Sequence, residues 1–169
     1  MALNTGFLGE LKHEAVNTRK MLERVPTDKL SWKPHEKSMT LGRLASHLAE
    51  LPFWMRATIE NAELDFAKYP RIPFKGETTE QIVNEYNKRI EEATKILEIA
   101  TDEQLNAIWT MRNGEKIFFQ LPRKIVLRNF VFNHQVHHRG QLSVYLRLLN
   151  VPVPGMYGPS ADEKESQES

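Results

Sequence analysis

Apolar side chains recur at helical spacing along most of this chain, and this pattern limits the fold more than any other feature. It predicts four helices, over residues 3–25, 40–62, 78–97 and 122–150. Each predicted helix carries one apolar stripe, and packing the four stripes against one another buries all of them. We therefore expect an all-α fold, a four-helix bundle, in one domain over residues 1–150.

Polar residues and prolines mark the ends of the predicted helices. The segment "VPTDKL" ends the first helix, and Ser38 or Thr40 is a suitable N-cap for the second. Thr78 and Gln81 have the spacing of a capping box at the start of the third. Residues 65–77 contain two prolines and a glycine, which indicates a long connection.

Two further segments are not expected to be helical. β-Prone residues flank Asn113-Gly114, a dipeptide that favours a type I′ turn, so we expect a small β-hairpin before the last helix. The end of the chain, "VPVPGMYGPSADEKESQES", cannot continue a helix past its prolines. Residues 151–169 are therefore predicted to be a Pro-rich segment with a disordered polar tail.

Composition excludes several classes of function. The 169 residues contain no cysteine, so any metal must be bound by nitrogen and oxygen atoms. A net charge of +1 gives no broad field for binding nucleic acid. No apolar run is long enough to cross a membrane. The N-terminal residues lack the pattern of a signal peptide, and we expect a cytoplasmic protein.

Histidines lie on the apolar stripes of two predicted helices. His134 and His138 are four residues apart and share one face, whereas His137 points to another side. His47 lies on the leucine stripe of the second helix. Two imidazoles one turn apart can bind one metal ion, as in the H-E-x-x-H helix of metalloproteases. Gln135 replaces the glutamate of that motif, so the sequence does not support a protease of this kind.

The histidines have two interpretations. They can be neutral core residues joined by hydrogen bonds, or they can be ligands of one ion. Three buried imidazoles without a shared role leave many nitrogens in need of partners, and one divalent cation would bind three of them. We therefore predict a metal site formed by His47, His134 and His138. Three neutral ligands leave a coordination position open, as in catalytic centres, and zinc or nickel is the favoured ion.

Other polar residues near the histidines stay open to two interpretations. Glu50 either accepts a hydrogen bond from an imidazole or reaches the metal, or it is an ordinary exposed helix glutamate, which we favour. Gln141 and Tyr145 either contact a bound ligand or make ordinary packing contacts. Arg139 is expected to form a surface or dimer salt bridge. No catalytic residue is assigned.

Two long segments of the sequence resemble the DinB family, within the DinB/YfiT-like group. They are "LSWKPHEKSMTLGRLASHLAELPFW" and "NHQVHHRGQLSVYLRLLNVPVPGMYGPSADE", and the resemblance extends over nearly the whole chain. It implies a four-helix bundle of unusual connectivity. It also implies a divalent metal bound by one histidine of the second helix and an HxxxH pair of the fourth, which are His47, His134 and His138 here. Similar proteins are often homodimers.

The resemblance also implies classes of reaction. Relatives in the wider group include transferases that join small thiols to electrophiles. We therefore expect a divalent-metal-binding enzyme of the thiol S-transferase kind, with a small thiol or an electrophilic small molecule as substrate. A metal-dependent hydrolase is the nearest alternative. A third is a non-catalytic stress-response dimer, in which the ion only joins two helices.

Overall fold

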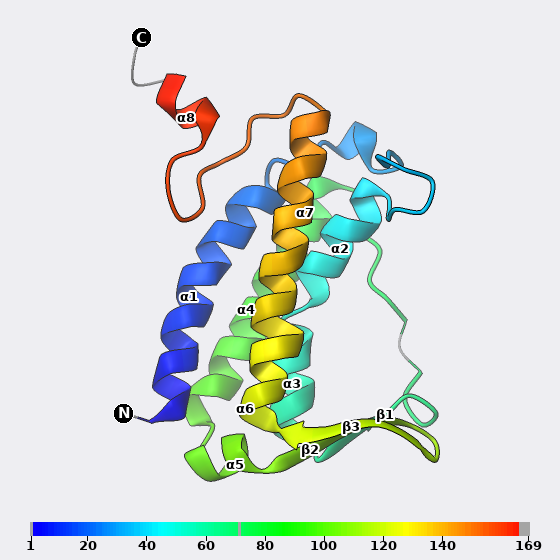
Figure 1. The fold of residues 1–169 in the computed structure, drawn as a ribbon, viewed down its shortest axis with the longest axis vertical. Coiled ribbons are helices and arrows are strands. Elements are labelled where there is room, and N and C mark those ends of the chain that lie inside the picture. Colours follow the sequence, from blue (N-terminus) through cyan, green and yellow to red (C-terminus); the bar gives the residue numbers. More distant parts are fainter. Residues whose placement is uncertain (1, 71, 166–169) are drawn as a thin grey trace.

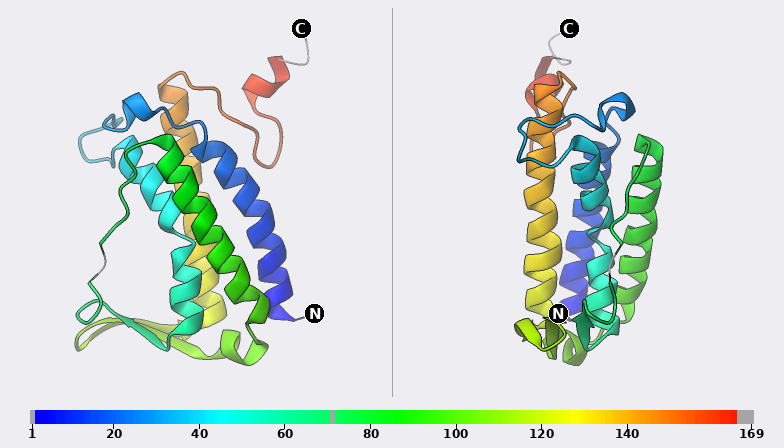
Figure 2. Two further views of the ribbon diagram at one scale, coloured as in Figure 1. Left: turned by 180° about the vertical axis from the view of Figure 1, so that it is seen from behind. Right: turned by 90° about the vertical axis from the view of Figure 1, so that its right-hand side faces the viewer.

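The computed structural model describes residues 2–70 and 72–165 and is mostly helical (Figure 1). Its longer helices are α1 (Leu3–Leu22), α2 (Leu41–Glu50), α3 (Phe53–Glu60), α4 (Thr79–Ile99) and α7 (His134–Leu148). The views in Figure 2 show α1, α4 and α7 side by side along the length of the molecule, with α2 and α3 following one another end to end beside them. The N-terminus and a small sheet lie at one end, and the C-terminal segment at the other. In the described part of the chain, no helix is long and apolar enough to span a membrane.

The prediction of one helix over residues 40–62 is wrong, because the chain forms α2 and α3 there. α2 begins after Thr40, whose hydroxyl oxygen accepts a hydrogen bond from the backbone N–H of Arg43 at 3.2 Å. The helix ends at Glu50 because Pro52 has no backbone N–H and its ring clashes with the preceding turn. The two helices pack separately against α4.

The prediction of one continuous α-helix over residues 122–150 is also wrong. The chain forms the single turn α6 (Arg123–Val126), the π-helix η2 (Leu127–Asn133) and then α7. A π-helix has i→i+5 hydrogen bonds, so it contains an extra residue that an α-helix of the same span would not hold. Such segments are frequent at functional sites. Here the π-helix ends directly before His134.

A mixed three-stranded sheet lies where the sequence predicts a hairpin alone. Its order is β1 (Glu63–Asp65), β2 (Ile108–Asn113) and β3 (Lys116–Pro122). β2 pairs antiparallel with β3 and parallel with β1. Asn113 pairs with Lys116, so Gly114 and Glu115 connect the strands in place of the predicted Asn113-Gly114 turn. Gly114 supplies the positive φ, 58°, that this connection requires.

The remaining short elements connect the longer ones. The 3₁₀ helix η1 (Thr27–Lys29) follows α1, and α5 (Asp102–Asn106) leads into β2. Thr101 and Gln104 form a complete capping box on α5. At the predicted box on α4, Thr78 accepts from the backbone N–H of Gln81 as expected, but the Gln81 side chain accepts from Glu77 instead of Thr78.

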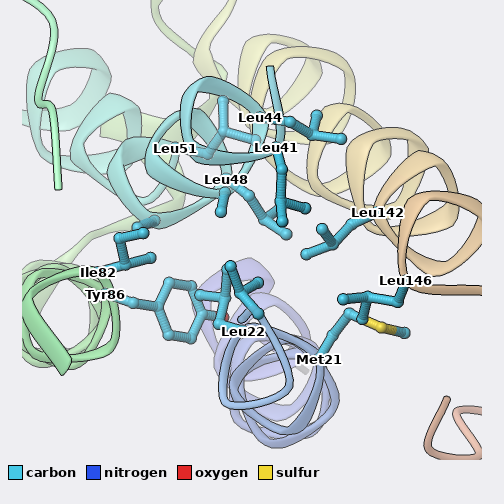
Figure 3. Close-up of a cluster of buried hydrophobic side chains, with 13 residues drawn as sticks. Met21, Leu22, Leu41, Leu44, Leu48, Leu51, Ile82, Tyr86, Leu142 and Leu146 are labelled. Atoms are coloured by element: carbon cyan, nitrogen blue, oxygen red, sulfur yellow. The ribbon is translucent and has the colours of Figure 1, made fainter. Parts of the chain in front are cut away.

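Two apolar clusters fill the space between the helices. The cluster in Figure 3 joins α2 to α1, α4 and α7 through Met21, Leu22, Leu41, Leu44, Leu48, Leu51, Ile82, Tyr86, Leu142 and Leu146, among others. A second cluster, nearer the sheet, includes Phe7, Leu11, Leu97 and Val131. The stripes at helical spacing are therefore the buried faces, as the sequence predicts.

A buried polar network links α1, α4 and α7. Arg139 is 2% exposed, pairs with Glu14 at 2.6 Å and donates to the Thr18 hydroxyl at 3.0 Å. Gln135 donates to the same hydroxyl at 2.8 Å and to the Tyr86 hydroxyl at 3.0 Å. The prediction of a surface or dimer salt bridge for Arg139 is therefore wrong, because its carboxylate partner is buried in the same chain.

The C-terminal segment is described through residue 165, and residues 161–165 are helical where the sequence predicts the start of a disordered polar tail. The Tyr157 hydroxyl accepts from Arg139 and donates to Glu14 at 2.9 Å. In α8 (Ala161–Glu165), Asp162 accepts two hydrogen bonds from Arg147, at 2.9 and 2.6 Å. The Arg147 guanidinium lowers the pKa of Asp162 to about 2. Residues 166–169 of the predicted tail lie outside the described residues.

Candidate metal centre

Three histidines from two helices meet between α2 and α7. His47 belongs to α2, and His134 and His138 lie one turn apart at the start of α7. One ring nitrogen from each lies within 4.8 Å of the other two. Nε2 of His134 lies 2.8 Å from Nε2 of His138 and 3.4 Å from Nε2 of His47. The structure thus brings together the three predicted residues, while His137 is exposed.

The nitrogen geometry is compatible with a bound cation. A ring nitrogen has one in-plane position, which holds either a proton or a lone pair. Nε2 of His134 faces two other ring nitrogens and cannot hydrogen-bond to both at once. A tetrahedral ion with nitrogen ligands at about 2.0–2.1 Å sets those ligands about 3.3 Å apart. The 3.4 Å separation matches this spacing, and the 2.8 Å separation needs a shift of about 0.5 Å.

The second nitrogen of each ring has its own acceptor. Nδ1 of His138 lies 2.7 Å from the Gln141 side-chain oxygen, and Nδ1 of His47 lies 3.3 Å from the Glu50 carboxylate. His134 hydrogen-bonds the backbone of Phe130. An N–H at Nδ1 that donates to such an acceptor leaves Nε2 with a free lone pair. Each ring is therefore oriented as a metal ligand requires.

Glu50 is buried beside His47, at 4% exposure. One carboxylate oxygen accepts from His47 Nδ1 and, at 3.4 Å, from Arg43 Nη1. The other accepts the backbone N–H of Phe74 at 2.8 Å. The favoured interpretation of Glu50 as an exposed glutamate is therefore wrong, and the alternative, an acceptor that orients an imidazole, agrees with the geometry. The contact also holds the connection before α4 against α2, next to the histidines.

Burial keeps two of the imidazoles neutral. Desolvation lowers the pKa of His138 to about 4; the hydrogen bond to Gln141 opposes this change, and the neighbouring imidazoles add to it. Desolvation also lowers the pKa of His134, and the nearby His47 lowers it further. At neutral pH both rings are unprotonated, so their Nε2 lone pairs are available to a cation.

The other candidate residues divide between site and core. Gln141 contacts His138 and belongs to the site. Tyr145 does not, because its ring packs on Trp32 and its hydroxyl donates to the Met39 carbonyl at 3.2 Å. Gln135 occupies the position of the glutamate in H-E-x-x-H helices. Its side chain donates to the hydroxyls of Thr18 and Tyr86 in the buried polar network and not to the histidine cluster. Sequence reasoning missed Phe130, because a backbone carbonyl leaves no trace in residue type.

Comparison with known proteins identifies the family. The sequence model of the DinB family matches residues 1–169. The chain belongs to the DinB family. Two uncharacterized proteins of Bacillus subtilis (strain 168) are similar to this DinB chain, and each is 30% identical to it. For YrdA the match covers 93% of this chain and 89% of the relative, and for YjoA it covers 81% and 84%.

Solved structures agree with this assignment. A DinB-like protein from Bacillus cereus ATCC 10987 has a TM-score of 0.70 at 30% identity, over 92% of this chain and 98% of that chain. The DinB-like protein YjoA from Bacillus subtilis also has a TM-score of 0.70, over 88% and 96% of the two chains. Its identity is 20%, so this likeness shows the fold alone. This DinB chain thus has the fold of its family and a three-histidine cluster compatible with metal binding.

Proposed function

We propose that this DinB protein binds one divalent metal ion, zinc or nickel, through Nε2 of His47, His134 and His138. The observation that carries the proposal is the convergence of three Nε2 atoms in rings whose other nitrogens have acceptors. Imidazole nitrogen suits both ions. Metal-binding histidines almost always donate their second N–H to a carboxylate, carbonyl or water, as these rings do to protein acceptors.

We further propose that the centre is catalytic and that the protein is a metal-dependent S-transferase, which joins a small thiol to an electrophile. Within the described residues, the cluster includes no fourth histidine, aspartate or glutamate. A coordination position therefore stays open, whereas structural zinc sites are normally closed by four protein ligands. A divalent ion bound there supplies Lewis acidity and lowers the pKa of a thiol or water that it binds. The chain itself holds the His47 and His138 rings in place through Glu50 and Gln141.

Metal content tests the binding proposal. We expect about one equivalent of metal in purified untagged protein by elemental mass spectrometry, and loss of most of it in His138→Ala. His137→Ala is the matched control, because this neighbouring ring is exposed and lies outside the cluster. A native protein that holds no metal and takes up neither zinc nor nickel would rule the proposal out.

Activity separates the three alternatives. An S-transferase should accelerate the attack of N-acetylcysteine or glutathione on 1-chloro-2,4-dinitrobenzene, in which the sulfur replaces chloride and the thiol proton is released. A hydrolase should instead cleave 4-nitrophenyl acetate in the metal-loaded form. If a chelator unfolds the protein and the metal-loaded protein is inactive in both assays, the purely structural role is favoured.

We also propose that the protein is a homodimer and that the exposed face of α7 forms its interface. Val136, Val144 and Leu148 are 40%, 57% and 56% exposed and recur, with Gly140, at four-residue intervals. A Cβ at Gly140 would meet nothing within 4 Å, so a second helix can approach closely there. Light scattering after size exclusion should give a dimer for the native chain and a monomer for Val144→Lys. Val16→Lys, at a position on α1 that is 50% exposed, should stay dimeric.

A further inference from the structure

A cavity of about 470 Å³ lies between η1, the start of α2 and the segment Phe74–Glu77. None of the three histidines lines it. Its volume is in the range of small-molecule sites, which is roughly 300–1,000 Å³. Leu30 and Phe74 give it apolar walls. The cavity is therefore separate from the metal centre and has the size and surface of a binding site.

The walls of this cavity are fixed by close backbone packing. A Cβ at Gly42 would lie 3.0 Å from the Leu30 carbonyl oxygen, and one at Gly76 would lie 2.3 Å from Ile82 Cγ1. The backbone N–H of Gly76 also donates to the buried Ser46 hydroxyl at 3.0 Å. A side chain at Gly76 would overlap Ile82, and one at Gly42 would press on Leu30, so the chain is closely packed around the cavity at these two places.

Arg43 lines the cavity and has hydrogen-bonding capacity to spare. A guanidinium has five N–H donors. Within the described residues, Arg43 uses its side chain in one contact, to Glu50 at 3.4 Å, and the side chain is 41% exposed. The cavity is also lined by Lys75 and by two exposed acidic residues, Glu77 and Asp28, of which Asp28 pairs with Lys29 at 3.3 Å. Of these charged groups, the Arg43 guanidinium offers the planar paired donors that match a carboxylate.

We propose that this cavity binds a small carboxylate with an apolar tail. The tail lies against Leu30 and Phe74, and the carboxylate pairs with Arg43, whose planar donors match the two carboxylate oxygens. This binding requires no metal, so the proposal stands apart from the proposed function.

Calorimetry with two probes of equal tail length tests the binding site. Octanoate should bind the purified protein with 1:1 stoichiometry, at least tenfold more tightly than 1-octanol. Arg43→Gln should weaken octanoate binding at least tenfold and leave the two probes with similar affinities. Lys33→Gln removes an exposed positive charge that does not line the cavity, and it should bind octanoate as the native chain does. Ser31→Phe adds bulk at the cavity wall and should abolish binding of both probes.

Three results would overturn the proposal. They are no octanoate binding at millimolar concentration, equal affinity for the two probes in the native chain, and unchanged octanoate binding in either Arg43→Gln or Ser31→Phe. Thermal melting shows whether each variant is folded, and a variant that is not is replaced by Arg43→Lys or Ser31→Leu. The metal content of the same samples, measured in parallel, shows whether the proposed metal site holds independently of the cavity.

Discussion

Nδ1 of His47 lies 3.3 Å from one oxygen of Glu50, whose second oxygen accepts the backbone N–H of Phe74 at 2.8 Å. One carboxylate thus fixes an imidazole and the connection that precedes α4. We expect Glu50→Ala to lower metal affinity by about 10–100-fold, the usual effect of removing such an acceptor. Glu50→Gln should lower metal affinity less, because its amide oxygen can still accept a hydrogen bond from Nδ1 of His47.

A chelator competition assay measures this affinity, with Glu60→Ala as the control. Glu60 lies on the exposed side of α3 and pairs with Arg56, away from the histidines. Native-like metal affinity in Glu50→Ala would show that Glu50 does not orient His47.

The buried pair of Arg139 and Glu14 should dominate the effect of single substitutions on stability. Arg139→Met leaves the Glu14 carboxylate buried without its cation, and breaking a buried pair in this way costs about 3–5 kcal/mol. Arg147→Met removes an arginine that is 51% exposed, and we expect it to cost about 1 kcal/mol or less. Urea denaturation of both variants gives the comparison, and the double variant Glu14→Gln/Arg139→Met should recover part of the loss. Equal costs for the two arginines would contradict the buried network.

The C-terminal segment should be sensitive to acid. Since the folded pKa of Asp162 is about 2, below its ordinary 3.8, the folded chain binds this proton less readily than the unfolded chain. The stabilising effect of Asp162 is therefore complete above about pH 4 and is lost as the pH falls through about 2. Carboxyl NMR titration should give a midpoint near 2 in the native chain and a higher one in Arg147→Gln. A midpoint that Arg147→Gln does not move would show that the pair is absent in solution.

Two glycine substitutions should have opposite effects. Gly76→Ala places a Cβ against the buried Ile82 side chain, and we expect it to destabilise the fold by roughly 1–3 kcal/mol. Gly140→Ala meets nothing within 4 Å and improves helix propensity, so in a monomer it should stabilise the fold by roughly 0.5–1 kcal/mol. Chemical denaturation measures both. If Gly140→Ala instead lowers the free energy of unfolding and shifts the protein from dimer to monomer, a second chain packs on this face, as we propose.

The histidine cluster could be predicted because helical spacing alone places His47, His134 and His138 on buried stripes. The break at Pro52 was missed, although the proline that causes it is visible in the sequence. By contrast, β1 has three residues and its partner strand lies more than 40 residues later, so no local pattern marks it. The π-helix before His134 likewise leaves no trace in the apolar spacing.

The orienting contacts and the buried network were harder to predict. The position of Glu50 next to His47 on α2 suited either a buried or an exposed side chain, and the backbone of Phe74 decides it. Arg139 is buried, with the exposed Tyr157 in contact with it, only because Glu14, more than 120 residues earlier, supplies the opposite charge. Such long-range pairs depend on how helices pack, which residue type and spacing do not specify.

The π-helix η2 determines how α6 and β3, which precede it, are rotated about the helix axis relative to α7. Each residue of an α-helix turns the chain by about 100°, so deleting Asn129 and closing η2 to an α-helix would rotate α6 and β3 about the axis of α7 by that angle. Val126, now fully buried, would leave the small apolar cluster that it forms with Trp109 and Met111 of β2, whereas His134 and His138 would keep their mutual spacing. The number of residues in η2, more than their identity, therefore sets how the sheet is oriented with respect to the histidines.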